Sequence, residues 1–371
     1  MPMRVPTTAV LLLLIAPAIA CQTDPAAQTV AKSAEALART KAPDPPAASN
    51  STPAVTEAHA AEAVAKSRTL FFYTSPRSTV EMAVHSIPET DQQRLARLRD
   101  NFRAADCDGN RMQEQPISRK GGENGTNLIC TWPGATRGTI VIVAHYEHEG
   151  KGQGALADWS GAVLLPFLYE AIQGQPRENS YVFLEAWKRV GAETWLKSLP
   201  KAERRNIRAV IDLDALGLGT PRFYTTFSPF ENAPPGSAHL QTQLLWAAVD
   251  DGLTQSPEQT STRHWLSVDD TDPFRAETIP SIVIHSVPPE SERVPGSADD
   301  VAAAVNGNAY FQTYHLICAY LASLDRVAAK LDTHDRMWDA SGPIDVQPES
   351  ETPRVTFRNI YGGRLGVAPP K

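Results

Sequence analysis

The chain has 371 residues, of which 42% are hydrophobic and 21% are charged, and its formal net charge is −7. These values are ordinary for a globular protein with a substantial core. A negative net charge gives no reason to expect nucleic acid or an anionic membrane surface as a partner.

Residues 1–20 have the pattern of a secretory signal peptide. Arg4 supplies a positive charge, and residues 9–20 form an apolar run that is too short to span a bilayer. Cys21 completes the sequence AIAC, which resembles a lipoprotein signal-peptidase site. The resemblance implies cleavage before Cys21 and a lipid anchor on its thiol, and Gln22 favours an outer-membrane lipoprotein that faces the periplasm or the exterior. Plain secretion with an incidental cysteine is the alternative.

Residues 21–67 are rich in Ala and Pro and predict a flexible tether. We expect one folded domain over residues 68–330 and a polar tail over 331–371. Because an exported compartment is oxidising, Cys107 and Cys130 are candidates for a disulfide, whereas Cys318 lies on an apolar helical face and predicts a buried free thiol.

Within the domain, apolar runs typical of buried strands alternate with helical patterns. Strands are predicted over 126–132, 138–145, 180–187, 207–216 and 279–286. Helices are predicted over 91–107, 160–174, 192–206 with an interruption near Pro200, 237–252 and 307–331. This alternation predicts an α/β three-layer sandwich, with a mixed, mostly parallel sheet between helices.

Acid–base side chains stand at the ends of the predicted strands. His145, Asp214 and His285 end three strands, and Glu185 stands near the end of a fourth. Since sites in open α/β sheets form at the carboxyl ends of strands, a His with several carboxylates there suggests a metal site.

Three segments, in order, resemble motifs of the zinc exopeptidases of family M-28 in clan MH. The segment VAHYEHEGKGQGALADWSGA is similar to AHYDH…GAxDDxSGA, IDLDALGLG to xNLDxxG, and DDTDPFRAETIPSIVIHS to SDHxPFxxxGIPxxxx. The resemblance implies a phosphorylase/hydrolase-like fold, an aminopeptidase activity on peptides and two zinc ions as cofactors. A His and an Asp would bind one zinc, a Glu and a His the other, and an Asp would bridge them, while a further Glu would act as base.

Two of the five implied ligands are clear in this chain. His145 matches the first His and Asp214 matches the Asp of xNLDxxG. A gap-free alignment puts Ala157 in the bridging position, and Asp158 serves there only if the register slips by one residue. Glu147 replaces the Asp that would orient the first imidazole.

The remaining positions are substituted. Anchoring the family's EExG pattern on Gly191 puts Lys188 and Arg189 in place of the two Glu residues, whereas a later anchor keeps Glu185 as a catalytic base. The last His should stand four residues before an Asp, and the match PGSAD puts Pro295 there. His285 falls inside its strand, so we interpret it as structural.

Two function hypotheses follow. In the first, the chain is a non-catalytic lipoprotein that binds a peptide or a protein terminus in the old cleft, and Lys188 or Arg189 lies near Asp214 or Asp158 in place of the lost metal charge. In the second, the chain is a metal-dependent aminopeptidase with a rearranged or single-zinc site. His145, Asp214 and Asp158 would then bind the metal, with Glu185 as base and His148 as a further donor.

Overall fold

The structure is a computed structural model of the whole chain. It describes residues 73–119, 122–148, 150–174, 176–225, 233–250, 252–253, 255–260 and 269–332. All of them belong to one unit, Pro53–Lys371. The predicted signal peptide, Cys21, the whole predicted tether and nearly all of the predicted tail lie outside the described residues.

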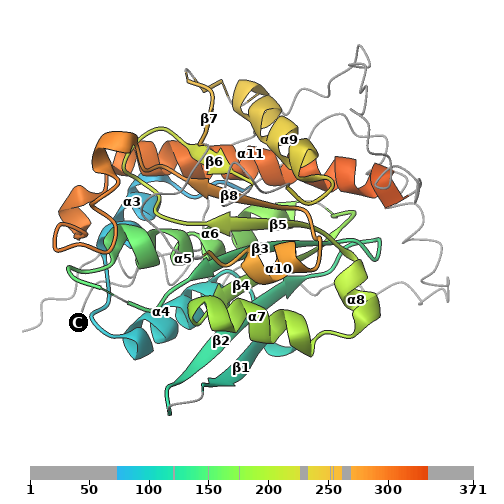
Figure 1. Cartoon of the computed structure of the whole chain (residues 1–371), viewed down its shortest axis with the longest axis horizontal. Helices are drawn as coiled ribbons and strands as arrows, with labels where there is room; N and C mark the ends of the chain where they lie inside the picture. The colour runs from blue at the N-terminus through green and yellow to red at the C-terminus, as the bar shows by residue number, and fades with distance from the viewer. Residues whose placement is uncertain are drawn as a thin grey trace, which may run out of the picture. The chain divides into compact units, whose positions relative to one another are not determined.

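A mixed sheet of eight strands forms the centre of the described part (Figure 1). In spatial order the strands are β1 (Met112–Ser118), β2 (Asn124–Trp132), β4 (Ser180–Ala186), β3 (Thr139–His145), β5 (Ile207–Leu213), β8 (Ser281–His285), β6 (Arg222–Tyr224) and β7 (Glu258–Gln259). The four central strands, β4, β3, β5 and β8, run parallel. Their carboxyl ends therefore meet at one edge of the sheet.

Helices cover both faces of the sheet. One face packs against α3 (Arg77–His85), α4 (Asp91–Ala104), α5 (Ser160–Ala162), α6 (Leu165–Ala171), α9 (Ser237–Asp250) and α11 (Gly307–Asp332). The other packs against α7 (Lys188–Ser198) and α10 (Asp272–Ala276), and the short α8 (Lys201–Arg205) follows α7. This arrangement confirms the predicted α/β sandwich.

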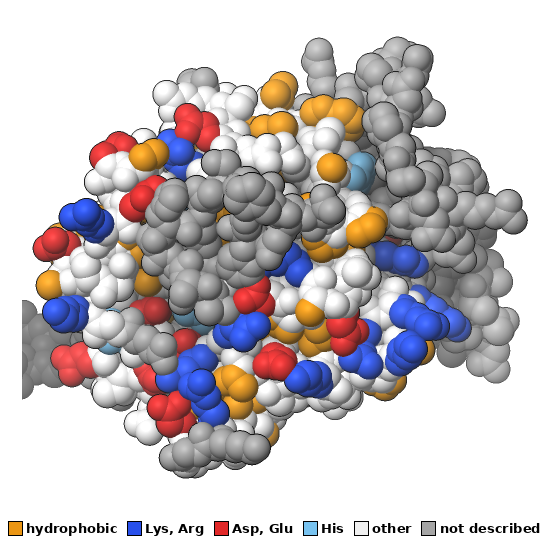
Figure 2. Space-filling view, in the orientation of Figure 1, with side chains coloured by type: hydrophobic (Ala, Val, Ile, Leu, Met, Phe, Trp, Pro, Cys, Tyr) orange, Lys and Arg blue, Asp and Glu red, His pale blue; other side chains and the backbone are white. Residues whose placement is uncertain are grey.

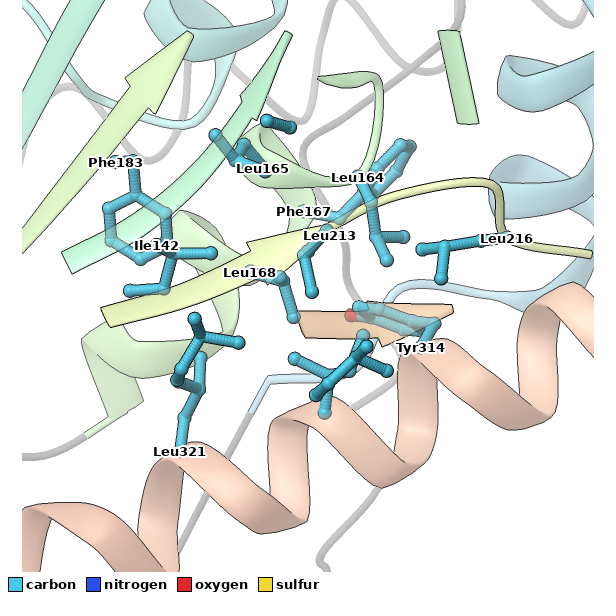
Figure 3. Packing of buried hydrophobic residues seen from close by; sticks show 14 of the residues in the cluster. Ile142, Leu164, Leu165, Phe167, Leu168, Phe183, Leu213, Leu216, Tyr314 and Leu321 are labelled. Atoms are coloured by element: carbon cyan, nitrogen blue, oxygen red, sulfur yellow. The ribbon is translucent and has the colours of Figure 1, made fainter. Parts of the chain in front are cut away.

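The alternation of side chains along each strand separates the two cores. Ile140 and Ile142 of β3 face the large core, whereas Val141 and Val143 face the smaller one. Figure 3 shows Leu321 of α11 close to the large-core face of the central strands. Because both faces are covered, these strands appear in the sequence as continuous apolar runs.

Several elements were not predicted from the sequence. Strand β1 is an edge strand whose side chains are mostly exposed and which contains Pro116, so it carries no apolar pattern. Helices α3 and α10 are short, and β6 and β7 have three and two residues. The helix expected from residue 160 begins earlier, because residues Ala155–Trp159 form a π-helical turn.

One stretch of helix in the described part, Ala155–Gly174, is long and apolar enough to cross a membrane. All of it is buried, since the sheet lies on one side and α11 on another. Its apolar surface therefore belongs to the core of the domain.

Five of the described tyrosines are completely buried, and we call four of them the core tyrosines: Tyr181, Tyr310, Tyr314 and Tyr320. Three of their hydroxyls donate to backbone carbonyls, and the fourth accepts the amide hydrogen of Ser75. Burial raises the pKa of each core tyrosine well above 10.0. Their neutral form is therefore part of the folded state.

A disulfide joins Cys107 to Cys130. It ties the segment that follows α4 to the middle of β2, and both cysteines are completely buried. Cys318 is a buried cysteine of α11 and takes no part in this disulfide.

Candidate functional site

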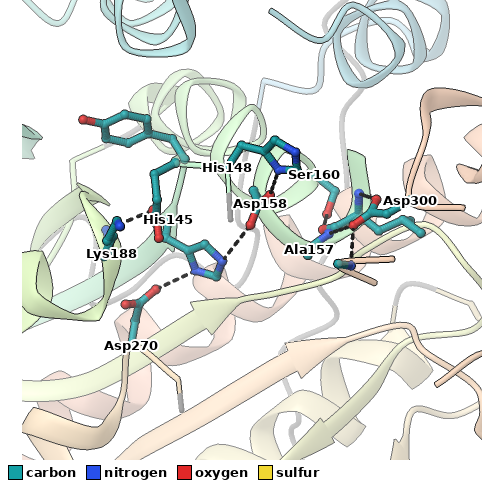
Figure 4. Close-up of polar contacts among 12 residues, drawn as sticks. His145, His148, Ala157, Asp158, Ser160, Lys188, Asp270 and Asp300 are labelled. Atoms are coloured by element: carbon teal, nitrogen blue, oxygen red, sulfur yellow. Dashed lines mark hydrogen bonds and ion pairs between the residues drawn. The ribbon is translucent and has the colours of Figure 1, made fainter. Parts of the chain in front are cut away.

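The carboxyl ends of the central strands bring the predicted site residues to one place. His145 is the last residue of β3, and Asp214 follows β5 directly. Asp158 comes from the π-helical turn that follows β3. The side chains of His145 and Asp158 face each other, with 3.7 Å between Nε2 and Oδ1 (Figure 4).

His145 lies between two carboxylates. Its Nδ1 is 2.9 Å from Oδ2 of Asp270, and its Nε2 faces Asp158. Burial alone would lower the pKa of His145, but the hydrogen bond to Asp270 and the charges of Asp270, Glu147 and Asp214 outweigh it, so the pKa lies well above 6.5. The arrangement therefore favours an imidazolium at this position.

Asp158 extends the contacts to a second imidazole. Its Oδ2 is 2.9 Å from Nδ1 of His148, which is part-exposed. Burial raises the pKa of Asp158, while His148, His145 and Arg94 oppose that rise. Asp270, His145, Asp158 and His148 thus form a chain of alternating carboxylates and imidazoles (Figure 4).

Arg94 of α4 completes the surroundings of Asp158. Its Nη1 is 3.9 Å from Oδ2 of Asp158, and the guanidinium lies 5.9 Å from the ring centre of Trp159. The side chain is 1% exposed. It also donates to the carbonyl oxygens of Tyr146 and Gln153.

The two cations expected near Asp158 or Asp214 make their ion pairs elsewhere. Lys188 Nζ is 3.7 Å from a carboxylate oxygen of Glu123, and Arg189 Nε is 3.1 Å from one of Asp272. An arginine that the sequence analysis did not single out, Arg94, lies beside Asp158. Lys188 opens α7 with a positive φ of 57°, and the side chain of Arg189 is half-exposed on that helix.

Glu147 does not contact the imidazole of His145 in the way the resemblance implied. Its Oε2 accepts the amide hydrogen of Lys188 at 2.9 Å, and Asp270 takes the place beside the ring. Burial raises the pKa of Glu147 to about 8, against the lowering effect of His145.

Glu185 is a poor candidate for a catalytic base. It is 0% exposed, and neither carboxylate oxygen accepts a hydrogen bond from a residue that the structure describes. It points into the core on the same face as Phe183, and burial raises the pKa of Glu185 well above its usual value. A base must reach a water molecule or a substrate, and this carboxylate is enclosed.

Asp300 holds the π-helical turn. Its carboxylate accepts amide hydrogens from Leu156 at 2.7 Å, Ala157 at 3.2 Å and Gly296 at 2.8 Å. Asp300 is completely buried, whereas the neighbouring Asp299 is exposed. An alignment anchored on Asp300 would put Gly296, rather than Pro295, in the position of the last metal-binding His.

His285 is a structural residue, as expected. It ends β8 inside the sheet and is 2% exposed. Its Nε2 is 3.1 Å from Oγ1 of Thr260, and its Nδ1 accepts the amide hydrogen of Val287.

The residues at the substituted positions do not fit a two-zinc centre. In the gap-free alignment the bridging position holds the methyl group of Ala157, and the anchor on Gly191 replaces the Glu pair by Lys188 and Arg189. Neither Pro295 nor Gly296 has a donor side chain. Among the described residues, no group of three or more His, Cys, Asp and Glu side chains is arranged to hold a metal ion. Zinc sites in proteins use at least three such donors.

Sequence reasoning missed Arg94, Asp270 and Asp300. A signal existed for Arg94, because it shares the buried stripe of α4 with Leu98 and Phe102 at intervals of four residues. Asp270 lies in the DDTDPF segment that carried the resemblance. Nothing in the local sequence distinguishes Asp300 from Asp299.

The described surface is of mixed charge. On the face shown in Figure 2, acidic and basic side chains lie side by side. Several of them are paired, for example Arg189 with Asp272 and Arg204 with Glu277.

Comparison with known proteins identifies a family. The model of peptidase family M28 matches residues 127–330. No curated protein sequence matches the chain significantly.

Among solved structures, LapA of Legionella aligns with a TM-score of 0.54 and 14% identity, over 79% of this chain and 81% of LapA. A glutaminyl cyclase of an Acidobacteriales bacterium aligns with a TM-score of 0.53 and 16% identity, over 78% of this chain and all of the cyclase. A zinc aminopeptidase of Bacillus subtilis is 17% identical, with a TM-score of 0.47, over 54% of this chain and only 50% of the aminopeptidase. The likenesses to LapA and to the glutaminyl cyclase show the fold.

Proposed function

Since the chain belongs to peptidase family M28, we propose that it is a non-catalytic member, an exported lipoprotein that binds a peptide or a protein terminus where relatives carry their catalytic centre. Fold alone does not decide this, because one fold hosts active and inactive proteins. The observation that carries the proposal is the donor set at the strand ends.

Three of the five positions that would bind zinc carry side chains without a donor or with a positive charge. The two donors that remain are His145 and Asp214, and both ring nitrogens of His145 face carboxylates of the chain itself. A third donor is needed before zinc binds with useful affinity. This argument rests on the kinds of side chain at these positions.

The second candidate is a single-zinc aminopeptidase, and one observation favours it. Asp158 lies 3.7 Å from the imidazole of His145, and the charge of Asp214 acts on the same ring. A displacement of the imidazole from Asp158 would leave His145, Asp158 and Asp214 as three donors of the kinds that zinc accepts. Glu185 would have to reach the site to act as base.

Zinc content separates the two candidates. The chain with Cys21→Ser, which cannot be lipidated, is purified from an exporting host with zinc present, dialysed, and its zinc is counted by mass spectrometry. The proposal predicts a value near zero that does not change in His145→Ala. A value near one that His145→Ala abolishes would establish the single-zinc site, and a value near two would contradict the alignment of both substituted segments.

Ligand binding is tested on the same material. A pool of unstructured peptides with free or acetylated N-termini, and with free or amidated C-termini, is passed over the immobilised chain. The proposal predicts that binding depends on one terminus and weakens in Asp158→Asn or Lys188→Ala. Equal retention of all four pools would argue against recognition of a terminus.

A further inference from the structure

We infer that Arg94 takes over the role of a metal ion in this site: its guanidinium neutralises Asp158 and ties together the backbone that leads from β3 to the π-helical turn. The inference rests on the proposed function, because it concerns a site without metal. It makes Arg94 a positioning residue and not a catalytic one.

The position of Arg94 on its helix is the first observation. Arg94, Leu98 and Phe102 form the buried stripe of α4, and Arg94 is 1% exposed. A guanidinium in such a place is costly unless carboxylates and carbonyl oxygens satisfy it. A residue chosen only for packing would be apolar here, as the other two are.

The contacts of Arg94 are the second observation. Nη1 donates to the carbonyl oxygen of Tyr146 at 3.1 Å, Nη2 donates to that of Gln153, and Nε donates to that of Pro88 at 3.2 Å. Tyr146 and Gln153 stand at the two ends of the segment between β3 and the π-helical turn. One side chain therefore fixes both ends of the segment that carries His148.

The charges around Arg94 are the third observation. The carboxylates of Asp158, Asp91, Glu147 and Asp300 all act on the guanidinium, with Asp158 the strongest of them. A bound cation in a metal site does two things, since it neutralises converging carboxylates and joins donors from separate segments. Arg94 does both, with five N–H donors in a fixed plane.

The origin of Arg94 in the chain supports a replacement. Arg94 lies on α4, before residue 127, where the family match begins. The charge is therefore contributed from outside the segment that carries the family's motifs. His145, between Asp270 and Asp158, and His148, 2.9 Å from Asp158, are the imidazoles that contact the same group of carboxylates.

A purely structural role predicts a different energetic behaviour. If Arg94 only satisfied the three carbonyl oxygens, the loss on its removal would not depend on the charge of Asp158. If it neutralises Asp158, removal leaves a buried carboxylate without that partner, and replacing Asp158 by its neutral amide should relieve the loss.

The test is a double-mutant cycle on the full chain. Thermal unfolding is measured for the parent, Arg94→Met, Asp158→Asn and the double variant, at 1 mM EDTA. We expect Arg94→Met to lower the Tm by about 10 °C, and the double variant to recover at least half of that loss. Losses that simply add in the double variant would overturn the inference.

Two further measurements keep the result decisive. If Arg94→Met alone does not fold, a folded double variant supports the inference, whereas failure of both while Asp158→Asn folds overturns it. The matched control is the cycle of Arg99→Met and Glu114→Gln. These residues form a part-exposed ion pair, and Arg99 lies on the same helix as Arg94, so we expect Tm changes below about 2 °C. The zinc count of the parent protein tests the proposed function separately. If the parent binds no zinc but the Tm losses of Arg94→Met and Asp158→Asn add in the double variant, only the role of Arg94 is refuted.

Discussion

Replacement of Asp300 by alanine should destabilise the domain more than any other single change near the site. The carboxylate accepts three amide hydrogens, two from the π-helical turn and one from the loop that contains Gly296. It is completely buried, so water cannot take its place without a rearrangement. Asp300→Ala removes the acceptor for all three donors at once.

The magnitude follows from these bonds. A buried donor left without a partner costs about 1–3 kcal/mol. Three such donors, partly relieved by relaxation, give a loss of about 3–6 kcal/mol in the free energy of unfolding. For a domain of this size the Tm should fall by about 10–20 °C. Asp300→Asn keeps one acceptor oxygen, so we expect about half of that loss.

Urea unfolding, followed by tryptophan fluorescence, measures the effect. The matched control is Asp299→Ala, whose side chain is exposed next to Asp300 and accepts no hydrogen bond from a described residue. We expect the control to change the free energy of unfolding by less than about 0.5 kcal/mol. The reasoning is refuted if Asp300→Ala and Asp299→Ala unfold at the same urea concentration.

Three other predictions concern stability and the metal site. In the folded state the pKa values of the core tyrosines lie above the unfolded value of 10.0, so their contribution to the free energy of unfolding is complete below pH 10 and is lost as the pH rises further. Between pH 9 and 11.5 we expect the denaturant concentration at the unfolding midpoint to fall while the absorbance of tyrosinate rises. Thr278 follows α10 with a φ of 59°, in the left-handed region. Thr278→Gly should therefore raise the free energy of unfolding, measured with urea, by about 1 kcal/mol, whereas Thr278→Ala should leave it unchanged. Ala157→Asp restores the carboxylate that the gap-free alignment with the family lacks at the bridging position, so we expect this variant to retain zinc in the mass-spectrometric count where the parent does not. An unchanged count would show that the turn no longer permits a metal site.

The layers of this fold and the first two site residues could be predicted from local sequence. Strands β3 and β5 are continuous apolar runs because both faces of the sheet are covered, and the polar residue that ends each run falls at the edge where sites form. For this reason the sequence predicts that His145 and Asp214 lie at that edge, and the structure places both of them there. The substitutions at Ala157, Lys188 and Arg189 were also visible there.

The partners of those residues could not be predicted in the same way. Arg94, Asp270 and Asp300 come from segments that are distant from His145 in sequence, and only the tertiary packing brings them together. A helical pattern assigns an arginine to the surface by default, although α4 turns Arg94 inward. The exchange of a metal for a buried side chain that we propose depends on the fold, so a motif-by-motif alignment does not contain it.

The way α11 packs has a consequence for the order of events in the cell. The helix begins at Gly307 and ends at Asp332, yet it lies against α3, near the beginning of the described chain, and against α6 and α9. The large core therefore lacks one wall until the last third of the polypeptide has been synthesised. Since such long-range contacts form slowly, the growing chain stays unfolded while most of it emerges. In the exported protein that we propose, a chain in that state could still be threaded through a narrow export channel and would fold on the far side of the membrane, where Cys107 and Cys130 can be oxidised.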